Sequence, residues 1–186
     1  MLLQDKKWVA FFSHTGNEIY NISKQIGRFP DRVVTNKQPG DKSINKKLSN
    51  RVDMVYVKDR PEAEDYSRVI WADSIVTLHG WMRVLPKKVC KEYDIYNLHP
   101  GLITKYPELK GADPQRRVFE CPDPDRYKHV GCVIHDVTAK VDDGKVRMSR
   151  STFNVFPGTD TLTKHLHTMA TEMWIDFINL DYEQCH

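Results

Sequence analysis

Residues 8–17, with the sequence WVAFFSHTGN, decide the fold class of this chain. Residues 8–12 form a continuous apolar run, as in a buried strand, and a small polar turn with a glycine follows. Residues 18–26 carry isoleucines at helical spacing and end before Gly27, a common helix stop. Residues 32–35 are predicted as a second strand. A chain that runs strand, turn, helix, strand is starting a doubly wound α/β domain.

The rest of the chain continues this alternation. Further strands are predicted at residues 54–57, 74–78, 95–98, 130–137 and 145–156, and further helices at residues 61–70, 115–119 and 161–180. Residues 38–50 are expected to be a loop with a short helix. The turn signal Asp142-Asp143-Gly144 makes the last two strands antiparallel neighbours. We therefore expect a single α/β domain over residues 1–186, with a doubly wound, mostly parallel, Rossmann-like sheet, a C-terminal antiparallel hairpin and a closing helix.

The composition narrows the classes of function. The chain has 186 residues, of which 40% are apolar and 28% charged, as in a soluble globular protein. A net charge of +3 gives no indication of nucleic-acid binding. No apolar run approaches the roughly 20 residues of a membrane helix, and the N-terminus does not resemble a signal peptide, so we expect a cytoplasmic protein. No two of the four cysteines have C-x-x-C spacing, so no metal site is expected.

Polar side chains gather where the predicted strands end. Such clusters occur at residues 13–18, 79–85 and 97–101, and open α/β sheets bind ligands at the carboxyl ends of their strands. Asn97 offers an amide donor, His99 an imidazole and Asp142 a carboxylate. Together these groups are suited to stabilise an oxyanion and to transfer one proton. Taken singly, each residue also fits a plain strand end or hairpin turn.

The remaining histidines are weaker candidates for catalysis. His14 and His79 lie at strand ends and are intermediate candidates. The histidines at 129, 135, 165 and 167 are expected to be structural or exposed, and those at 165 and 167 to lie far from the strand ends.

An ordered set of motifs resembles one known family. Met82-Arg83-Val84-Leu85, Asn97-Leu98-His99-Pro100-Gly101-Leu102, Lys105-Tyr106-Pro107, His135 and Asp142 follow one another at the spacing found in the glycinamide ribonucleotide formyltransferases. The resemblance spans residues 8–180 and implies an enzyme of one-carbon metabolism and purine biosynthesis. Such an enzyme moves a formyl group from 10-formyltetrahydrofolate to a small-molecule amine, here glycinamide ribonucleotide or a related amine.

The resemblance also implies roles for individual residues. Asn97 and His99 would bind the formyl oxygen, and Asp142 would pair with His99 and help to remove the amine proton through a water. The donor's pterin ring would lie against Met82, Arg83, Val84, Leu85 and Val141. The acceptor would bind at the first turn, formed by Thr15, Gly16, Asn17 and Glu18.

The sequence departs from the family pattern at the first turn and after the catalytic pair. Residues 13–18 stand where the family has Gly-x-Gly-Ser-Asn, and Glu18 is expected to compete with a substrate phosphate for the N–H groups of the helix. Gly101 replaces the usual serine.

These departures leave several activities open. The alternatives are a sugar-nucleotide N-formyltransferase, a formyltetrahydrofolate hydrolase and a non-catalytic folate- or nucleotide-binding protein of the same fold. The methionyl-tRNA enzyme carries an extra C-terminal domain, and because this chain ends soon after its last predicted helix, that acceptor is disfavoured. The sequence makes no prediction of oligomeric state.

Overall fold

A seven-stranded sheet in the order β3-β2-β1-β4-β5-β6-β7 forms the centre of the protein. The computed structural model describes residues 6–179. The strands are β1 (Lys7–Phe12), β2 (Arg32–Thr35), β3 (Asp53–Tyr56), β4 (Ser74–Leu78), β5 (Asp94–His99), β6 (His129–Asp136) and β7 (Val146–Phe153). Strands β1 to β5 pair in parallel, whereas β6 is antiparallel to β5 and β7 is antiparallel to β6. The predicted parallel sheet with a C-terminal hairpin is confirmed.

Helices connect the strands. They are α1 (Asn17–Ile26), α2 (Lys46–Ser49), α3 (Ala63–Val69), α4 (Lys87–Glu92), α5 (Pro114–Glu120) and α6 (Thr159–Asn179), with a 3₁₀ turn, η1 (Pro107–Leu109). Helix α1 ends, as predicted, at Gly27, whose left-handed φ of 73° suits a glycine. Helix α4 and η1 were not predicted, and the predicted end of the closing helix, Leu180, lies outside the described residues. Within residues 6–179, no helix is long and apolar enough to cross a bilayer.

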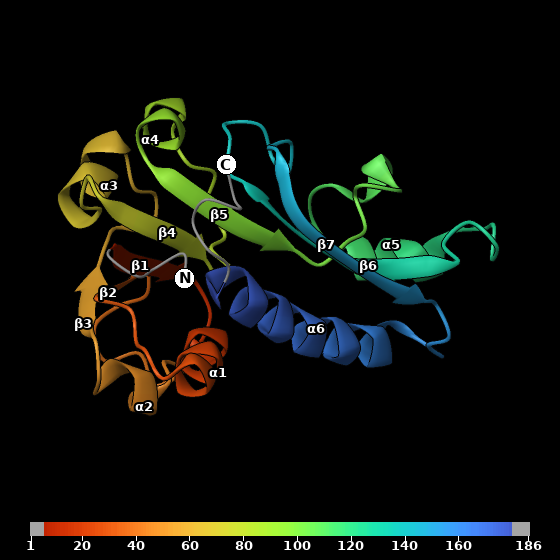
Figure 1. The fold of residues 1–186 in the computed structure, drawn as a ribbon, viewed down its shortest axis with the longest axis horizontal. Coiled ribbons are helices and arrows are strands. Elements are labelled where there is room, and N and C mark those ends of the chain that lie inside the picture. The colour runs from red at the N-terminus through yellow and green to blue at the C-terminus, as the bar shows by residue number, and fades with distance from the viewer. Residues whose placement is uncertain (1–5, 180–186) are drawn as a thin grey trace.

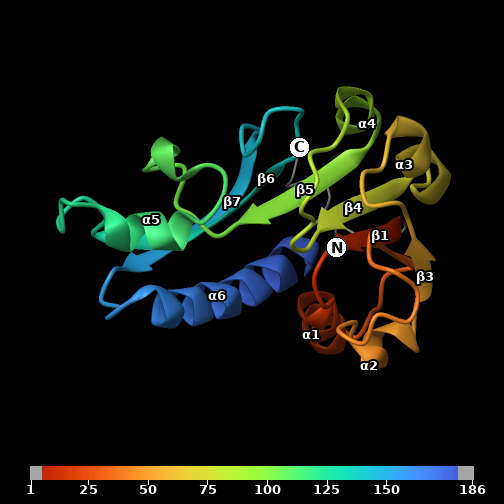
Figure 2. The same cartoon turned by 180° about the vertical axis from the view of Figure 1, so that it is seen from behind.

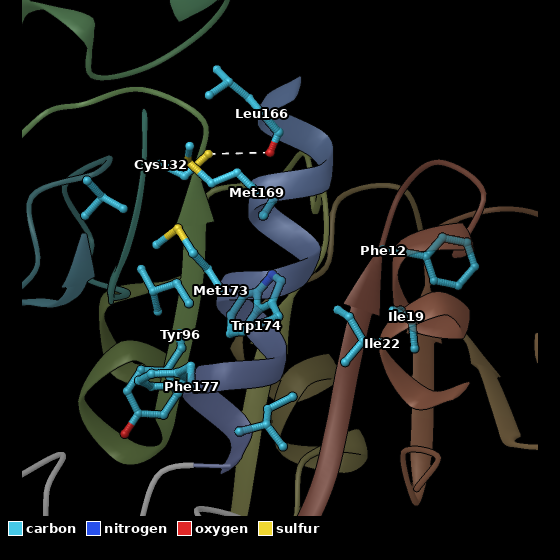
Figure 3. Close-up of a cluster of buried hydrophobic side chains, with 14 of the residues drawn as sticks. Phe12, Ile19, Ile22, Tyr96, Cys132, Leu166, Met169, Met173, Trp174 and Phe177 are labelled. Atoms are coloured by element: carbon cyan, nitrogen blue, oxygen red, sulfur yellow. Dashed lines mark hydrogen bonds between the residues drawn. The ribbon is translucent and has the colours of Figure 1, made fainter. Parts of the chain in front are cut away.

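The helices cover both faces of the sheet. Helices α1, α2 and α6 lie on one face and α3 and α4 on the other (Figures 1 and 2). On the first face, Met173, Trp174 and Phe177 of α6 are fully buried and point towards the sheet, where Phe177 makes an edge contact with Tyr96 of β5 (Figure 3). Burial of each such side chain contributes about 1.5–3 kcal/mol, so α6 anchors the half of the sheet that carries β5 and β6.

The loops after β1 and β4 meet where the strand order reverses. Chain connections lead from β1 to β2 on one side and from β3 across to β4 on the other, which leaves a crevice at the carboxyl ends of β1 and β4. The two loops are joined there, because His79 N–H donates to the Phe11 carbonyl at 2.8 Å and Ser13 N–H to the Gly80 carbonyl at 3.2 Å. The predicted clusters at residues 13–18 and 79–85 are therefore neighbours.

Candidate active site

The end of β5 and the facing part of β6 bring three polar side chains together. Asn97 and His99 are two residues apart on β5 and so share one face of the sheet. The antiparallel register places His135 of β6 opposite Asn97, and the Asn97 amide nitrogen lies 3.4 Å from His135 Nε2. Strand pairing alone therefore makes His135 a member of the cluster that the sequence predicted from Asn97 and His99.

The turn between β6 and β7 carries Asp142 over the same face. This turn is tight, because a Cβ at Gly144 would lie 1.8 Å from the Asp136 carbonyl oxygen, which only glycine permits. Asp142 adopts a left-handed φ of 50°, a conformation that aspartate tolerates better than most residues. Its carboxylate also accepts a hydrogen bond from the Gly111 N–H at 2.8 Å, so a second loop fixes its position.

The Asp142 carboxylate bridges two buried imidazoles. Oδ2 lies 3.1 Å from His99 Nδ1 and Oδ1 lies 3.3 Å from His135 Nε2. The other ring nitrogen of His99, Nε2, lies 2.9 Å from the Leu109 carbonyl oxygen. Both nitrogens of His99 therefore face acceptors, an arrangement that is fully satisfied only by the protonated ring.

The surroundings of Asp142 favour its charged form. Burial raises its pKa, but the hydrogen bonds from His135 and His99, the charge of His99 and the Gly111 N–H outweigh burial and hold the pKa of this carboxyl well below its ordinary value. Asp142 is thus a fixed negative charge within a largely buried cluster.

A cavity of about 560 Å³ opens beside this cluster. Asn97, His99, His135 and Asp142 all contribute to its lining. The stretch 82–85 and Val141 line the same cavity, and the side chains of Met82, Val84 and Val141 are 59%, 64% and 50% exposed. Apolar side chains left exposed around a cavity are characteristic of a ligand-binding site. Arg83, in contrast, is held by Asp59, because its Nε donates to the Asp59 carbonyl at 2.6 Å and its Nη2 pairs with the carboxylate.

The first turn differs from the expectation. Thr15, Gly16, Asn17 and Glu18 are not among the residues that line this cavity, whereas His14 is. Glu18 does not turn towards the backbone N–H groups of α1. Its carboxylate lies 2.8 Å from Nδ1 of His79, whose Nε2 lies 2.8 Å from the Thr77 hydroxyl.

The Glu18–His79 contact belongs to a buried chain of hydrogen bonds. Trp8 Nε1–H donates to the Thr77 hydroxyl at 2.8 Å, so that hydroxyl is free to donate to His79 Nε2. On its other side, the His79 ring donates from Nδ1–H to the Glu18 carboxylate. The sequence predicted that the Glu18 carboxylate would compete with a phosphate for the N–H groups at the start of α1. The carboxylate contacts His79 instead, so this prediction is wrong.

Two further expectations about histidines need correction. His135, expected to be structural or exposed, is buried and lies in the cluster with Asn97 and Asp142. His167 of α6 lines the cavity, although it was expected to lie far from the strand ends, because α6 packs across the sheet towards this loop region. The contributions of the Leu109 carbonyl and the Gly111 N–H were also missed. The local signal was Gly111 itself, whose φ of 85° lies in the left-handed region that favours glycine. Among residues 6–179, no group of three His, Cys, Asp or Glu side chains is arranged to hold a metal ion.

The chain is similar in sequence to known formyltransferases. It is 38% identical over 95 residues to phosphoribosylglycinamide formyltransferase of Dictyostelium discoideum (47% of this chain, 44% of that protein). It is 28% identical over 123 residues to methionyl-tRNA formyltransferase of Thermotoga sp. strain RQ2 (64% of this chain, 37% of that protein). The chain thus spans less than half the length of these relatives.

Solved structures show the same fold. Phosphoribosylglycinamide formyltransferase from Anaplasma phagocytophilum superposes with a TM-score of 0.81 at 21% identity, covering 97% of this chain and 88% of that chain. The family model described as formyl transferase matches residues 22–177, which is most of the chain. The protein therefore belongs to the formyl transferase family.

Proposed function

We propose that this protein transfers a formyl group from 10-formyltetrahydrofolate to an amine. The observation that carries the proposal is the position of His99, held between Asp142 and the Leu109 carbonyl at the edge of a cavity that Asn97 also lines. Formyl transfer needs donors for an oxyanion, a route for one proton and a pocket for a flat ring, and each has a counterpart among these residues.

The two donors act on the formyl oxygen. When the amine attacks the formyl carbon, the carbonyl oxygen takes up the negative charge of a tetrahedral intermediate. Asn97 Nδ2–H and His99 Nε2–H are the groups that donate to this oxygen. His99 Nε2 first exchanges the Leu109 carbonyl for the substrate oxygen, which requires a small rotation of its ring. Removing one such donor typically costs about 10²–10³-fold in rate.

Asp142 maintains the charge of His99. Because its pKa is far below the ordinary value, Asp142 is a weak base and a poor direct acceptor for the amine proton. We assign it to holding His99 protonated and correctly oriented. The amine proton then leaves through a water beside the carboxylate. Collapse of the intermediate breaks the bond between the formyl carbon and N10, and N10 takes up the proton that the amine has lost, which the same water delivers.

The donor's pterin ring is assigned to the apolar part of the cavity. Met82, Val84 and Val141 supply exposed apolar surface, and Leu85 closes the floor with its largely buried side chain. Residues 79–86 run irregularly between β4 and α4. Some of their backbone groups are already paired, since the His79 N–H donates to the Phe11 carbonyl and the Met82 N–H to the Ser13 hydroxyl, so the backbone of Arg83 and Val84 is assigned to the ring edge.

Glycinamide ribonucleotide, or a related small amine, is the proposed acceptor. The Dictyostelium relative is named for that substrate, and its similarity to this chain is the support for the assignment. Glu18 does not occupy the N–H groups at the start of α1, so the geometry of the first turn does not conflict with an anionic group there. Thr15, Gly16, Asn17 and Glu18 remain the proposed acceptor residues.

A panel assay tests the proposal. The protein is incubated with 10-formyltetrahydrofolate and one of several amines, including glycinamide ribonucleotide and amino sugars linked to nucleotides, and release of tetrahydrofolate is measured. Amine-dependent release that is lost in His99→Ala and Asp142→Asn supports transfer. Release without an amine indicates a hydrolase. No release with any amine, while the folate still binds, indicates a binding protein and contradicts the proposal.

A further inference from the structure

Arg117 of α5 holds the loop that faces His99. Its Nη1 donates to the Glu108 carbonyl at 2.6 Å, and its Nη2 donates to the Leu109 carbonyl at 2.8 Å and the Lys110 carbonyl at 2.9 Å. Three successive carbonyls of a loop are thus gathered on one guanidinium, a geometry that suits the planar, forked donors of arginine and not the point charge of lysine.

The Leu109 carbonyl connects Arg117 with His99. This oxygen accepts from Arg117 Nη2 at 2.8 Å and lies 2.9 Å from His99 Nε2, so its two lone pairs serve the two side chains. The same loop then supplies the Gly111 N–H that binds Asp142. Both members of the His99–Asp142 pair therefore contact a segment whose backbone Arg117 fixes.

The arrangement leaves one polar group of Arg117 without a partner. Nε is buried and makes no hydrogen bond among the described residues. Buried donors in folded proteins are nearly always paired, and an unpaired one needs an explanation. The explanation here is that the guanidinium is oriented to reach the loop carbonyls at the expense of Nε.

We propose that Arg117 is a positioning residue for His99, which it controls by fixing the Leu109 carbonyl. This inference rests on the proposed formyl transfer. When His99 Nε2 turns from the Leu109 carbonyl to the formyl oxygen, Arg117 still donates to that carbonyl and keeps it in place. The imidazole can therefore move without leaving the Leu109 oxygen buried and without a donor. Arg117 itself contacts no reacting atom in this scheme.

Two substitutions at one position and a neighbouring control test the inference. Arg117→Met removes the donors and keeps much of the apolar volume, and Arg117→Lys keeps the charge but not the fork. Arg116→Met is the matched control, since Arg116 is on the same helix, largely exposed and paired only loosely with Glu120 at 3.5 Å. For each protein, kcat and the KM for 10-formyltetrahydrofolate are measured, and folding is checked by circular dichroism and thermal unfolding.

We expect kcat to fall about tenfold to a hundredfold in Arg117→Met, in line with the usual cost of misplacing a reacting group by about 1 Å. The KM for the folate should stay within about twofold, because Arg117 does not contact the proposed pterin pocket. Arg117→Lys should be intermediate, and Arg116→Met should match the wild type. If Arg117→Met does not fold, the same measurements on Arg117→Lys are compared with those on Arg116→Met.

A second measurement reports on the His99 ring directly. The Nε2–H of His99 should give a slowly exchanging signal in ¹H–¹⁵N spectra, assigned by its absence in His99→Gln. We expect this signal in the wild type and in Arg116→Met, and its loss or broadening in Arg117→Met. An unchanged ring signal, or a kcat in Arg117→Met equal to that of the control, overturns the inference.

The two hypotheses fail in different ways. Absence of turnover by the wild-type protein contradicts the proposed function, while the ring signal still tests the link between Arg117 and His99. Normal turnover of both wild type and Arg117→Met contradicts only the inference.

Discussion

The imidazole of His99 lies against the backbone of Gly101, so closely that a Cβ on this glycine would be 2.7 Å from Nε2. The formyltransferase pattern that the sequence resembles has serine at this position. Glycine at this position leaves the space in which the ring reaches the Leu109 carbonyl.

Gly101→Ala is expected to lower turnover by displacing His99. The new methyl group would also lie 3.0 Å from the Pro114 Cβ, so it has ring atoms on one side and a packed proline on the other. A shift of the ring by about 1 Å is expected to cost up to about a hundredfold in kcat. Gly158→Ala is the control, since a methyl group at that glycine would meet no atom within 4 Å. Equal kcat in the two variants would contradict the assigned ring position.

Asp142→Asn is expected to change how stability depends on pH. The folded pKa of Asp142 is lowered, so its charge stabilises the fold above the ordinary aspartate pKa of about 3.9, and this contribution is lost as the pH falls below that value. The difference in the free energy of unfolding between wild type and Asp142→Asn should therefore be largest near neutral pH and shrink in acid.

Urea unfolding at several pH values from neutral to acid measures this difference. His99 and His135 face the carboxylate, and their own protonation is followed by NMR in the same samples. Asp143→Asn provides the comparison, because Asp143 pairs with Lys110 and Lys140 at the surface, where ion pairs contribute little. A pH-independent difference for Asp142→Asn would show that its charge is not what stabilises the site.

The sequence predicted the strands that carry the site better than the contacts within it. Apolar runs and turn residues located β4, β5 and the β6–β7 hairpin, because burial and turn chemistry are local properties. Asn97, His99 and Asp142 followed from motif spacing. Helix α4 was missed because its short sequence, Lys87–Glu92, is mostly charged and shows little periodicity.

The long-range contacts had no such local signal. The pairing of Glu18 with His79 depends on how the start of α1 is placed relative to the end of β4. The contacts of Arg117 and Gly111 depend on the path of an irregular loop that carries no repeating pattern. Tertiary packing determines both, and a single sequence does not report it.

His135→Phe is expected to reduce turnover without abolishing it. Phenylalanine keeps the ring volume on β6 but removes the donor to Asp142 Oδ1, which is 3.3 Å away, and the contact with the Asn97 amide. Asp142 keeps its partners His99 and Gly111, so we expect a loss of about tenfold, smaller than that in His99→Ala. His129→Phe, at the far end of the same strand, is the control. A loss as large as that of His99→Ala would instead place His135 among the groups that act on the substrate.

Glu18→Ala is expected to destabilise the protein because it leaves Nδ1 of the buried His79 without an acceptor. An unsatisfied buried donor costs about 1–3 kcal/mol in the free energy of unfolding. Glu18→Gln keeps a side-chain oxygen within reach of Nδ1 and should lose less. Glu64→Ala, at an exposed position in the first turn of α3, controls for the general effect of removing an acidic residue from a helix start. Equal losses for Glu18→Ala and Glu64→Ala would contradict a specific role for the Glu18–His79 pair.

The same Glu18→Gln variant also tests the acceptor site. It removes a negative charge beside the start of α1 while it keeps a hydrogen-bond acceptor for His79, so it separates charge from packing better than a serine would. If the acceptor places a phosphate at this turn, its KM should fall in Glu18→Gln, because less repulsion opposes the phosphate. The KM for an uncharged amine serves as the internal comparison and should not change. A KM for glycinamide ribonucleotide that is also unchanged would place its phosphate elsewhere and would remove Thr15–Glu18 from the proposed acceptor site.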